Sequence, residues 1–359
     1  MLEKIKNFYN GKKILIIGHT GFKGSWLTMV LSLFNSKLYG ISLNTTSRPS
    51  NFKVSEIDKK IKDYRIDIRD YKKIRQKINS INPDIIFNLA AQSLVRESFK
   101  DPYNTWSTNF SGCLNLLEIL KKRKTKKKIT LVLITSDKCY KNVNKSQGYK
   151  ENDLLGGHEP YGASKASVEI LFHSYFNSFF KNDKSITMAT ARAGNVIGGG
   201  DWSKDRIIPD LIKSYKKNKP ISIRYPSSTR PWQHVLDPIF GYIYLGYMLN
   251  KNKLKTNGES FNFGPLLKKN YTVKFLLNKI KKYLPNVKWK IIKNKNKFFE
   301  AGLLNLNSNK TLKIIKWKNI LNFDQSVLFT ADWYKYYFNN KNMYKKSIEQ
   351  INLYLKKLN

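Results

Sequence analysis

Tyr161 and Lys165 are the residues whose types and spacing point most directly to chemistry. Residues four positions apart share one face of a helix, so the Lys165 ammonium group can lie near the Tyr161 hydroxyl. A positive charge there favours phenolate over phenol, and we expect it to lower the pKa of Tyr161 toward that of a general base. Because a Tyr-x-x-x-Lys spacing occurs on many helices, the pair needs support from other residues.

Ser136, Asp137 and Lys138 provide that support, because they follow an apolar run at 129–134 where a buried strand would end. An acid and a base side by side are what the elimination of water requires. The alternative for such a dipeptide is a turn with solvated charges. Its combination with Tyr161 and Lys165 favours the catalytic interpretation.

A glycine-rich turn lies near the N-terminus. Gly18, Gly21 and Gly24 follow an apolar run and open a helical pattern that begins with Phe22 and Lys23. Glycine lets the backbone turn tightly and approach phosphates, while the start of a helix offers N–H donors and a positive dipole end. An ordinary strand-to-helix turn is the alternative, but three glycines in seven residues favour a dinucleotide site.

The elements that would position these residues alternate along the chain. Short apolar runs predict buried parallel strands at 13–18, 37–43, 85–89, 129–134 and 186–191, with helical stretches such as 105–121 between them. This order favours an α/β fold with a Rossmann-like, doubly wound parallel sheet. A more weakly patterned region after about residue 270, closed by a helix near 344–357, predicts a smaller mixed α/β C-terminal domain.

Two functional domains are expected from this order. We expect residues 1–191, with returning segments near 235–265, to bind the dinucleotide, and residues 192–234 and 266–359 to bind the substrate.

The charge of the chain suggests a different kind of partner. Its 359 residues include 66 Lys+Arg against 25 Asp+Glu, a formal net charge of +41, which alone would indicate nucleic acid. Only 10 of the basic residues are Arg, the residue that nucleic-acid interfaces favour for bidentate contacts. We therefore expect most lysines on solvated faces. The densest run, KKRKTKKK at 121–128, should form a loop between a helix and a strand, with a polyanion patch as the alternative.

Composition disfavours several classes of protein. An apolar content of 41% is enough for a large core, no run of about 18 apolar residues predicts a membrane span, and the N-terminus lacks a signal-peptide pattern. Cys113 and Cys139 are too few for a disulfide framework or a structural zinc site. We expect a cytoplasmic globular protein with no metal and no membrane partner.

Seven ungapped blocks extend the motifs along nearly the whole chain. They are GHTGFKGSWL (18–27), DIRD (67–70), NLAAQSLVRESFKDP (88–102), TSDKCY (135–140), PYGASKA (160–166), RAGNVIGGGDW (192–202) and RPWQHV (230–235). Together they resemble the extended short-chain dehydrogenase/reductases and, within these, the nucleotide-sugar 4,6-dehydratases. The SDK triplet and the last two blocks are most similar to the branch that acts on CDP-glucose.

The resemblance implies a lyase mechanism in which hydride is borrowed and returned. Tyr161, supported by Lys165, would remove the proton of the sugar 4-hydroxyl while the C4 hydride passes to NAD⁺, with Ser136 hydrogen-bonded to the same oxygen. Neutral Lys138 would then remove the C5 proton and protonated Asp137 would donate to the departing C6 hydroxyl. Return of the hydride to C6 would give CDP-4-dehydro-6-deoxyglucose.

The resemblance also implies which residues bind the cofactor. The implied contacts include the glycine turn with Phe22 and Lys23, and also Tyr161 and Lys165. Asp67 and Ile68 would lie near the adenine, and Leu89, Ala90 and Ala91 at a strand end. A surface position is the alternative for Asp67, and core packing is the alternative for Leu89, Ala90 and Ala91. Asn44 is a departure, because an acidic residue normally binds the ribose at this place and selects NAD, and the nearby Arg48 could attract a 2′-phosphate. We keep NAD because the dehydration recycles it.

Substrate contacts and partners follow from the same blocks. The implied sugar-nucleotide contacts are Asn195, Arg206, Arg230, Gln233 and His234, and Arg suits bidentate diphosphate binding. A hydrogen-bonded core residue is the alternative for His234, and Cys139, Glu300 and Trp333 are interpreted as structural. The family's pairing through long helices implies a homodimer or tetramer.

Two other functions stay open. One is a dehydratase or epimerase acting on another nucleotide sugar. The other is a dinucleotide-sensing, nucleic-acid-binding protein without activity, which the complete set of catalytic residue types disfavours.

Overall fold

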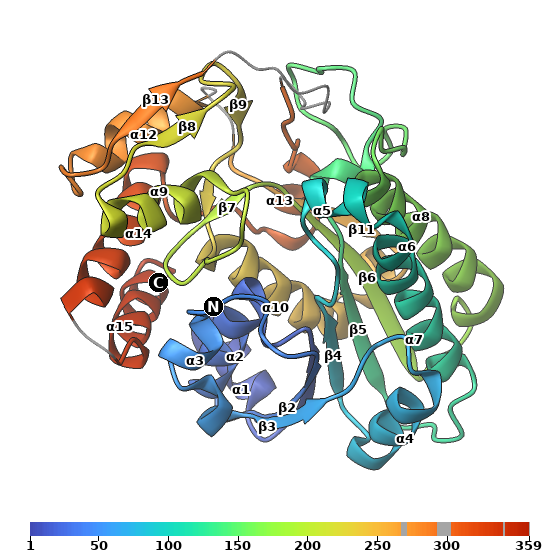
Figure 1. The fold of residues 1–359 in the computed structure, drawn as a ribbon. Helices are drawn as coiled ribbons and strands as arrows, with labels where there is room; N and C mark the ends of the chain where they lie inside the picture. The colour runs from blue at the N-terminus through green and yellow to red at the C-terminus, as the bar shows by residue number, and fades with distance from the viewer. Residues whose placement is uncertain (267–270, 293–302, 340–341, 359) are drawn as a thin grey trace.

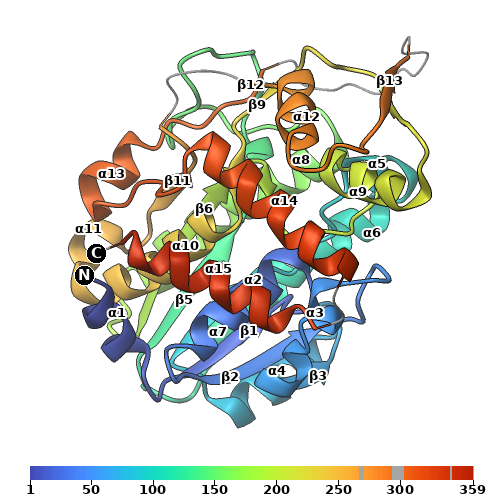
Figure 2. The same cartoon turned by 90° about the vertical axis from the view of Figure 1, so that its left-hand side faces the viewer.

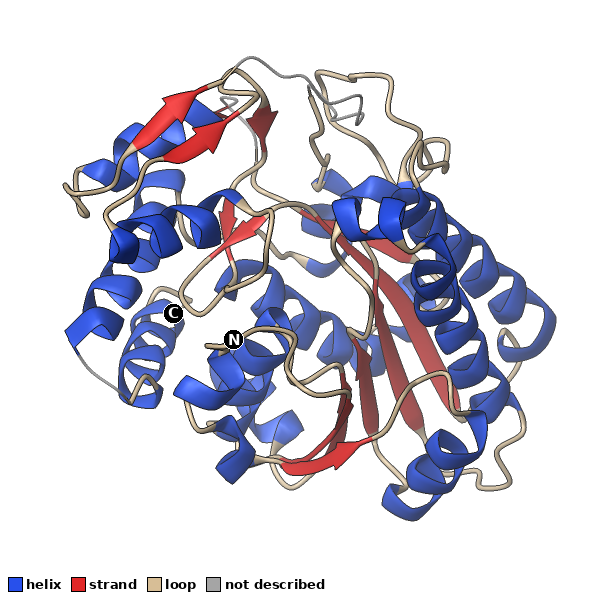
Figure 3. Ribbon diagram, viewed as in Figure 1, coloured by secondary structure: helices blue, strands red, loops and turns tan. Residues whose placement is uncertain are grey.

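A seven-stranded parallel sheet lies at the centre of the molecule (Figures 1 and 3). The computed structural model describes residues 1–266, 271–292, 303–339 and 342–358. The strands are β1 (Lys13–Ile17), β2 (Lys37–Ser42), β3 (Lys62–Arg65), β4 (Ile85–Asn88), β5 (Ile129–Ile134), β6 (Ile186–Ala193) and β11 (Ser260–Phe263). Their order in the sheet is β11-β6-β5-β4-β1-β2-β3. The reversal between β1 and β4 is that of a doubly wound, Rossmann-like fold, which confirms the predicted fold class.

Helices cover both faces of this sheet (Figure 1). One face carries α1 (Leu2–Tyr9), α2 (Phe22–Ser32) and α10 (Leu236–Lys251), and the other carries α4 (Tyr71–Ile81), α7 (Gly112–Lys121) and α8 (Pro160–Tyr175). Because side chains alternate along a strand, Ile14 and Ile16 of β1 enter the first core and Leu15 and Ile17 enter the second. This two-sided burial explains the continuous apolar runs of the strands.

All five predicted strands are present within two residues at either end. The predicted helix at 105–121 is a longer helical run of α6 (Pro102–Trp106), a π-helical segment (Ser107–Ser111) and α7. The lysine run forms the predicted loop between α7 and β5. Part of its charge is neutralised locally, since Lys122 lies 3.1 Å from Glu118 and Lys127 lies 2.9 Å from Asp84.

Short helical segments complete this part of the fold. They are α3 (Asn51–Val54), η1 (Ile57–Lys60), α5 (Val95–Lys100), η3 (Asp137–Cys139), a π-helical segment η4 (Phe176–Phe180) and α11 (Lys253–Thr256).

Residues after β6 add a smaller mixed α/β part. Three two-stranded sheets join β7 (Val196–Ile197) with β10 (Gln233–His234), β8 (Ile221–Ile223) with β13 (Trp289–Ile291), and β9 (Thr229–Arg230) with β12 (Tyr271–Thr272). The helices are α9 (Ile207–Lys217), α12 (Val273–Lys281), α13 (Asn309–Ile315), α14 (Phe323–Asn339) and α15 (Tyr344–Lys356). Figure 2 shows α14 and α15 at the side of the molecule that carries α10, and α15 packs against α2.

Trp333 of α14 is a buried structural residue, as interpreted from the sequence. Its indole Nε1 donates to Ser347 Oγ at 2.9 Å, and Gly199 packs directly on its ring. Glu300 lies outside the described residues. In the part of the chain that the structure describes, no helix has the length and apolar character needed to cross a membrane.

Candidate active site

The glycine turn lies where the strand order reverses. Gly18 follows β1 with φ +90°, and a Cβ added there would lie 2.7 Å from the backbone nitrogen of Ala90, after β4. A Cβ on Gly24 would lie 2.2 Å from Gly18 O. The two chain segments therefore approach at backbone contact, which only glycine allows.

The start of α2 is suited to an anion. Gly21 is its N-cap and provides no side-chain hydrogen bond, so the N–H groups of Phe22 and Lys23 keep their donor capacity. A pyrophosphate fits such a helix start, where bare N–H groups and the positive dipole end coincide. The observed turn thus fits the predicted dinucleotide.

The other predicted cofactor contacts lie at the same edge of the sheet. Leu89, Ala90 and Ala91 follow β4, with Ala90 against Gly18, and Asp67 and Ile68 lie shortly after β3. The Asp67 carboxylate is held by Arg69, whose Nη2 lies 2.6 Å away. Ile68 is buried against Gly112, so its side chain serves packing. Asn44 and Arg48 are exposed beyond the end of β2.

The predicted catalytic residues meet at the end of β5. Ser136 caps the short 3-10 turn η3 (Asp137–Cys139), where its Oγ accepts from Lys138 N at 3.3 Å and donates to Asp137 Oδ1 at 2.9 Å. The Ser136 side chain lies near enough to Tyr161 to lower the pKa of its hydroxyl. Helix α8 approaches closely because Gly162 lacks a side chain, since a Cβ there would lie 2.8 Å from Lys138 O.

Asp137 is suited to act as a proton donor. Its side chain is buried, and burial raises its pKa against the opposing charges of Lys138, Lys23 and Arg230. Its Oδ1 takes the Ser136 hydrogen bond, while Oδ2 has no partner among the described residues. A buried carboxyl with one uncommitted oxygen can hold a proton and offer it to a ligand.

Tyr161 corrects one prediction. Burial raises its pKa to about 12, although the Ser136 hydrogen bond and the charge of Arg206 oppose this rise. Lys165, also buried, donates to the backbone oxygen of Ile134 at 3.4 Å. The predicted lowering of the Tyr161 pKa by Lys165 is therefore not what the structure has, because desolvation outweighs the nearby charges.

Three of the predicted substrate contacts lie near the catalytic cluster, which consists of Ser136, Asp137, Lys138, Tyr161 and Lys165. Arg206 acts electrostatically on Tyr161 and Arg230 acts on Asp137, so both guanidinium groups lie near the acid–base residues. Arg206 Nη1 is held at 3.0 Å from Asp201 Oδ2. Asn195 is half-buried in the loop between β6 and β7.

Gln233 and His234 are placed differently from the prediction. Gln233 donates to Phe263 O at 2.9 Å and accepts from Asn319 at 3.0 Å, so both ends of its amide serve the fold. The His234 ring is fully buried, its Nδ1 accepts from Leu236 N at 3.3 Å, and burial lowers its pKa to about 3. A neutral core histidine, the alternative left open by the sequence, is what the structure has.

Two side chains of the cluster were not predicted in this role. Lys23, expected only as a cofactor contact, points its Nζ to Tyr242 OH of α10 at 3.3 Å, and burial followed by repulsion from Arg206 lowers its pKa to about 8. Tyr242 gave no sequence signal because it lies in an apolar helix.

Cys139 is buried and its pKa is raised by burial, which agrees with a packing role. The described residues contain no group of three His, Cys, Asp or Glu side chains arranged to hold a metal.

The sheet order, the glycine turn and the Tyr161–Lys165 helix define an extended short-chain dehydrogenase/reductase. Within this class, the chain belongs to the family described as GDP-mannose 4,6 dehydratase, whose model matches residues 15–328.

Individual relatives agree with this assignment. The chain is 38% identical over 355 residues to a CDP-glucose 4,6-dehydratase of Salmonella typhimurium, covering 98% of each chain. It is 27% identical to a UDP-glucose 4-epimerase of Mycoplasma genitalium over 70% of this chain and 76% of the relative.

Solved structures share the fold. An epimerase of Methanothermobacter thermautotrophicus superposes with a TM-score of 0.82 at 21% identity, covering 94% of this chain and 96% of the other. A dTDP-glucose 4,6-dehydratase of Bacillus anthracis, solved in complex with NAD, has a TM-score of 0.74 at 21% identity, covering 91% and 97%.

Proposed function

We propose that this protein is an NAD-dependent hydro-lyase that converts CDP-glucose to CDP-4-dehydro-6-deoxyglucose. The observation that carries the proposal is the η3 turn, which holds a buried carboxyl and an amine beside Tyr161. The relative that is 38% identical over 98% of the chain carries the corresponding name.

Tyr161, Lys138 and Asp137 are each assigned one step. Tyr161 takes the proton of the 4-hydroxyl, with Ser136 hydrogen-bonded at the same place. Lys138 removes the C5 proton, which the C4 ketone makes acidic. Asp137, whose pKa is raised by burial, donates its proton to the departing C6 hydroxyl.

NAD fits the residues present. Gly18, Gly21 and Gly24 make the close turn, and the N–H groups of Phe22 and Lys23 would hold the pyrophosphate. A bound dinucleotide would supply the hydride acceptor for oxidation at C4 and the hydride donor for reduction at C6. Burial opposes the ionisation of Tyr161, so positive charge beside its hydroxyl, such as that of Arg206, is what favours the phenolate.

A nucleotide-sugar epimerase is the second candidate, because several relatives are named UDP-glucose 4-epimerase. Epimerisation at C4 needs Tyr161 and a dinucleotide but no acid–base pair for elimination. The buried Asp137 with its uncommitted oxygen favours the dehydratase.

The test is a panel of CDP-, dTDP-, UDP- and GDP-hexoses with product identification. We expect CDP-glucose to give the 4-keto-6-deoxy sugar, seen by its absorbance in alkali and by loss of water in mass spectra. A product isomeric with its substrate would identify an epimerase. If the protein dehydrates another nucleotide sugar in preference to CDP-glucose, its substrate carries a base other than cytosine.

Three further assignments belong to this proposal. Residues 1–191 with 235–265 would hold the cofactor, and residues 192–234 with 266–359 the sugar nucleotide. A homodimer would form through α6 and α8, which pack together and expose Tyr103, Trp106 and Ile170 at 82%, 37% and 60%. A cytoplasmic location agrees with two cysteines that are both free thiols.

A further inference from the structure

A buried ion pair lies directly behind the acid–base turn. Glu169 of α8 and Arg192 of β6 are both almost completely buried, and Arg192 Nη2 lies 2.8 Å from Glu169 Oε2. Glu169 is four residues after Lys165, so Tyr161, Lys165 and Glu169 follow one another along one face of α8. In the sequence, the spacing of four residues from Lys165 is the pattern that points to Glu169.

The Glu169 carboxylate binds the segment just before the turn. Its Oε1 accepts a short hydrogen bond from Thr135 Oγ1, and Thr135 immediately precedes Ser136. Its Oε2 accepts from Thr190 at 2.8 Å and from Ser260 at 3.0 Å. Burial opposes its ionisation, but the Arg192 charge and these donors hold the pKa of Glu169 below its ordinary value, so the pair stays charged.

Arg192 binds the segment just after the turn. Its Nη1 donates to Tyr140 OH at 2.7 Å, and its guanidinium lies over the Tyr140 ring at 5.0 Å. Tyr140 immediately follows Cys139, the last residue of η3. The Tyr140 hydroxyl in turn donates to Asn262 Oδ1 of β11 at 2.8 Å.

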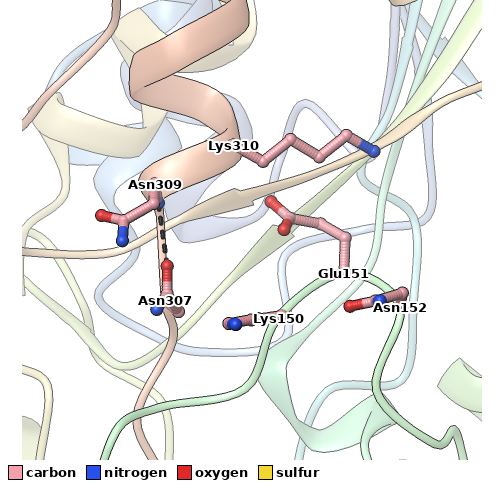
Figure 4. Close-up of a pocket in the computed structure, with 6 residues that line it drawn as sticks. All are labelled: Lys150, Glu151, Asn152, Asn307, Asn309 and Lys310. Carbon is pink, nitrogen blue, oxygen red and sulfur yellow. Dashed lines mark hydrogen bonds between the residues drawn. The ribbon is translucent and has the colours of Figure 1, made fainter.

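The outer end of this network reaches the pocket shown in Figure 4. Arg192 Nη1 also donates to Glu151 O at 2.9 Å, and Glu151 Oε1 accepts from Asn262 N at 2.8 Å. Figure 4 shows Glu151 between Lys150 and Asn152, facing the segment from Asn307 to Lys310. The network therefore spans from the turn to the C-terminal part of the chain.

We propose that Glu169 and Arg192, acting through Thr135 and Tyr140, are positioning residues that hold Asp137 and Lys138 in register with Tyr161. One ion pair fixes both ends of the turn, and its carboxylate belongs to the helix that carries Tyr161 and Lys165. A buried ion pair is weak evidence for stability, because apolar residues of similar volume can replace it at little cost. Its placement at both ends of a catalytic segment indicates a geometric role.

The inference rests on the proposed function and predicts which step is sensitive. The turn carries Asp137 and Lys138, the groups for elimination, whereas α8 carries Tyr161 for oxidation at C4. A loosened turn should slow elimination more than oxidation. Enzyme in turnover should then accumulate the reduced cofactor.

The test uses two gentle variants of the full-length protein, Thr135→Val and Tyr140→Phe. Each removes one hydroxyl between the ion pair and the turn and leaves the Glu169–Arg192 pair itself intact. We expect kcat to fall about 10- to 100-fold with KM nearly unchanged. We also expect the near-ultraviolet band of reduced nicotinamide to rise in the steady state.

Thr311→Val is the matched control. Thr311 is fully buried and donates to Asn262 O at 2.7 Å, so it touches the network at its outer end without contacting the turn. It should lower the melting temperature about as much as the other two variants while kcat and the cofactor spectrum stay as in the wild type.

Two outcomes would overturn the inference. If Thr135→Val and Tyr140→Phe match Thr311→Val in kcat and in the cofactor spectrum, the network is only structural. If the wild-type protein dehydrates no nucleotide sugar, the proposed function fails first and the inference falls with it.

Discussion

Asp137 and Lys138 are adjacent in the chain but occupy different environments. Asp137 is 3% exposed with its pKa raised by burial, whereas Lys138 is half-buried at the rim of the same turn. An acid that holds its proton in the interior and an amine nearer the surface are a suitable pair for removing water across one C–C bond.

Lys138→Ala should abolish dehydration, because no other amine of the turn can take the C5 proton. We expect ketosugar formation to fall by about 10²- to 10⁴-fold, measured by alkaline absorbance. The exposed Lys141→Ala is the control and should keep wild-type activity. Full activity of Lys138→Ala would remove Lys138 as the base.

Variants of Arg206 and His234 should differ in effect, because Arg206 is proposed to contact the substrate and His234 lies in the core. Arg206→Gln keeps a donor for Asp201 but removes the charge, so KM for the nucleotide sugar should rise about tenfold or more. His234→Ala should leave KM unchanged and lower the unfolding free energy by about 2 kcal/mol or more, because it opens a cavity in the core. Steady-state kinetics and denaturant titration measure both effects, and a raised KM in His234→Ala would return it to the binding site.

At the scale of elements, Asp237 joins α10 to the C-terminal part. This buried carboxyl accepts from Ile320 N at 2.7 Å and from Tyr354 OH of α15 at 3.0 Å. Burial raises its pKa from 3.8 to about 7. The folded protein therefore holds a proton that the unfolded chain has released between these pH values.

This shift predicts the direction of a pH dependence. The stability contributed by the protonated Asp237 is fully present below about pH 4 and is lost as pH rises through 7, roughly 4 kcal/mol over the window. The Asp237→Asn side chain does not titrate. In that variant the unfolding free energy should therefore depend less steeply on pH between roughly pH 4.5 and 7.5. Asp324→Asn, at an exposed carboxylate, is the control. If the unfolding free energy depends equally steeply on pH in both variants, the raised pKa of Asp237 is contradicted.

The sequence predicted the buried strands better than the edge strands. β1, β4 and β5 are continuous apolar runs, but β3 is KDYR, an exposed edge whose polar residues carry no strand signal. β11, SFNF, was missed because its buried Ser260 and Asn262 serve hydrogen bonds that only the assembled sheet reveals. Gln233 and His234 were misplaced for the same reason, since a motif gives neighbours in sequence and not the direction of a side chain.

The site was predictable where chemistry and spacing coincide. Ser136, Asp137, Lys138, Tyr161 and Lys165 do meet, because strand ends and the first turn of α8 share one edge of the sheet. The pKa of Tyr161 was not predictable, since it depends on desolvation rather than on the residue four positions away. Lys23 and Tyr242 meet across 219 residues of sequence, a contact that no local pattern contains.

At the scale of the whole molecule, the charge of +41 bears on association. Lys23, Arg206 and Arg230 place part of it beside the acid–base residues, where it can attract a diphosphate. We expect added salt to lower kcat/KM for the nucleotide sugar while kcat stays constant. A filter-binding titration of nucleic acid against salt is the comparison, and a steep log–log slope at physiological salt would revive a nucleic-acid role.

The most direct test of the central claim is the fate of deuterium placed at C4 of CDP-glucose. Oxidation at C4 followed by return of the same hydride to C6 predicts a product whose 6-methyl group carries the label, seen by NMR and mass spectrometry. Deuterium restored to C4 in an isomeric sugar, or lost to solvent, would contradict the dehydratase account.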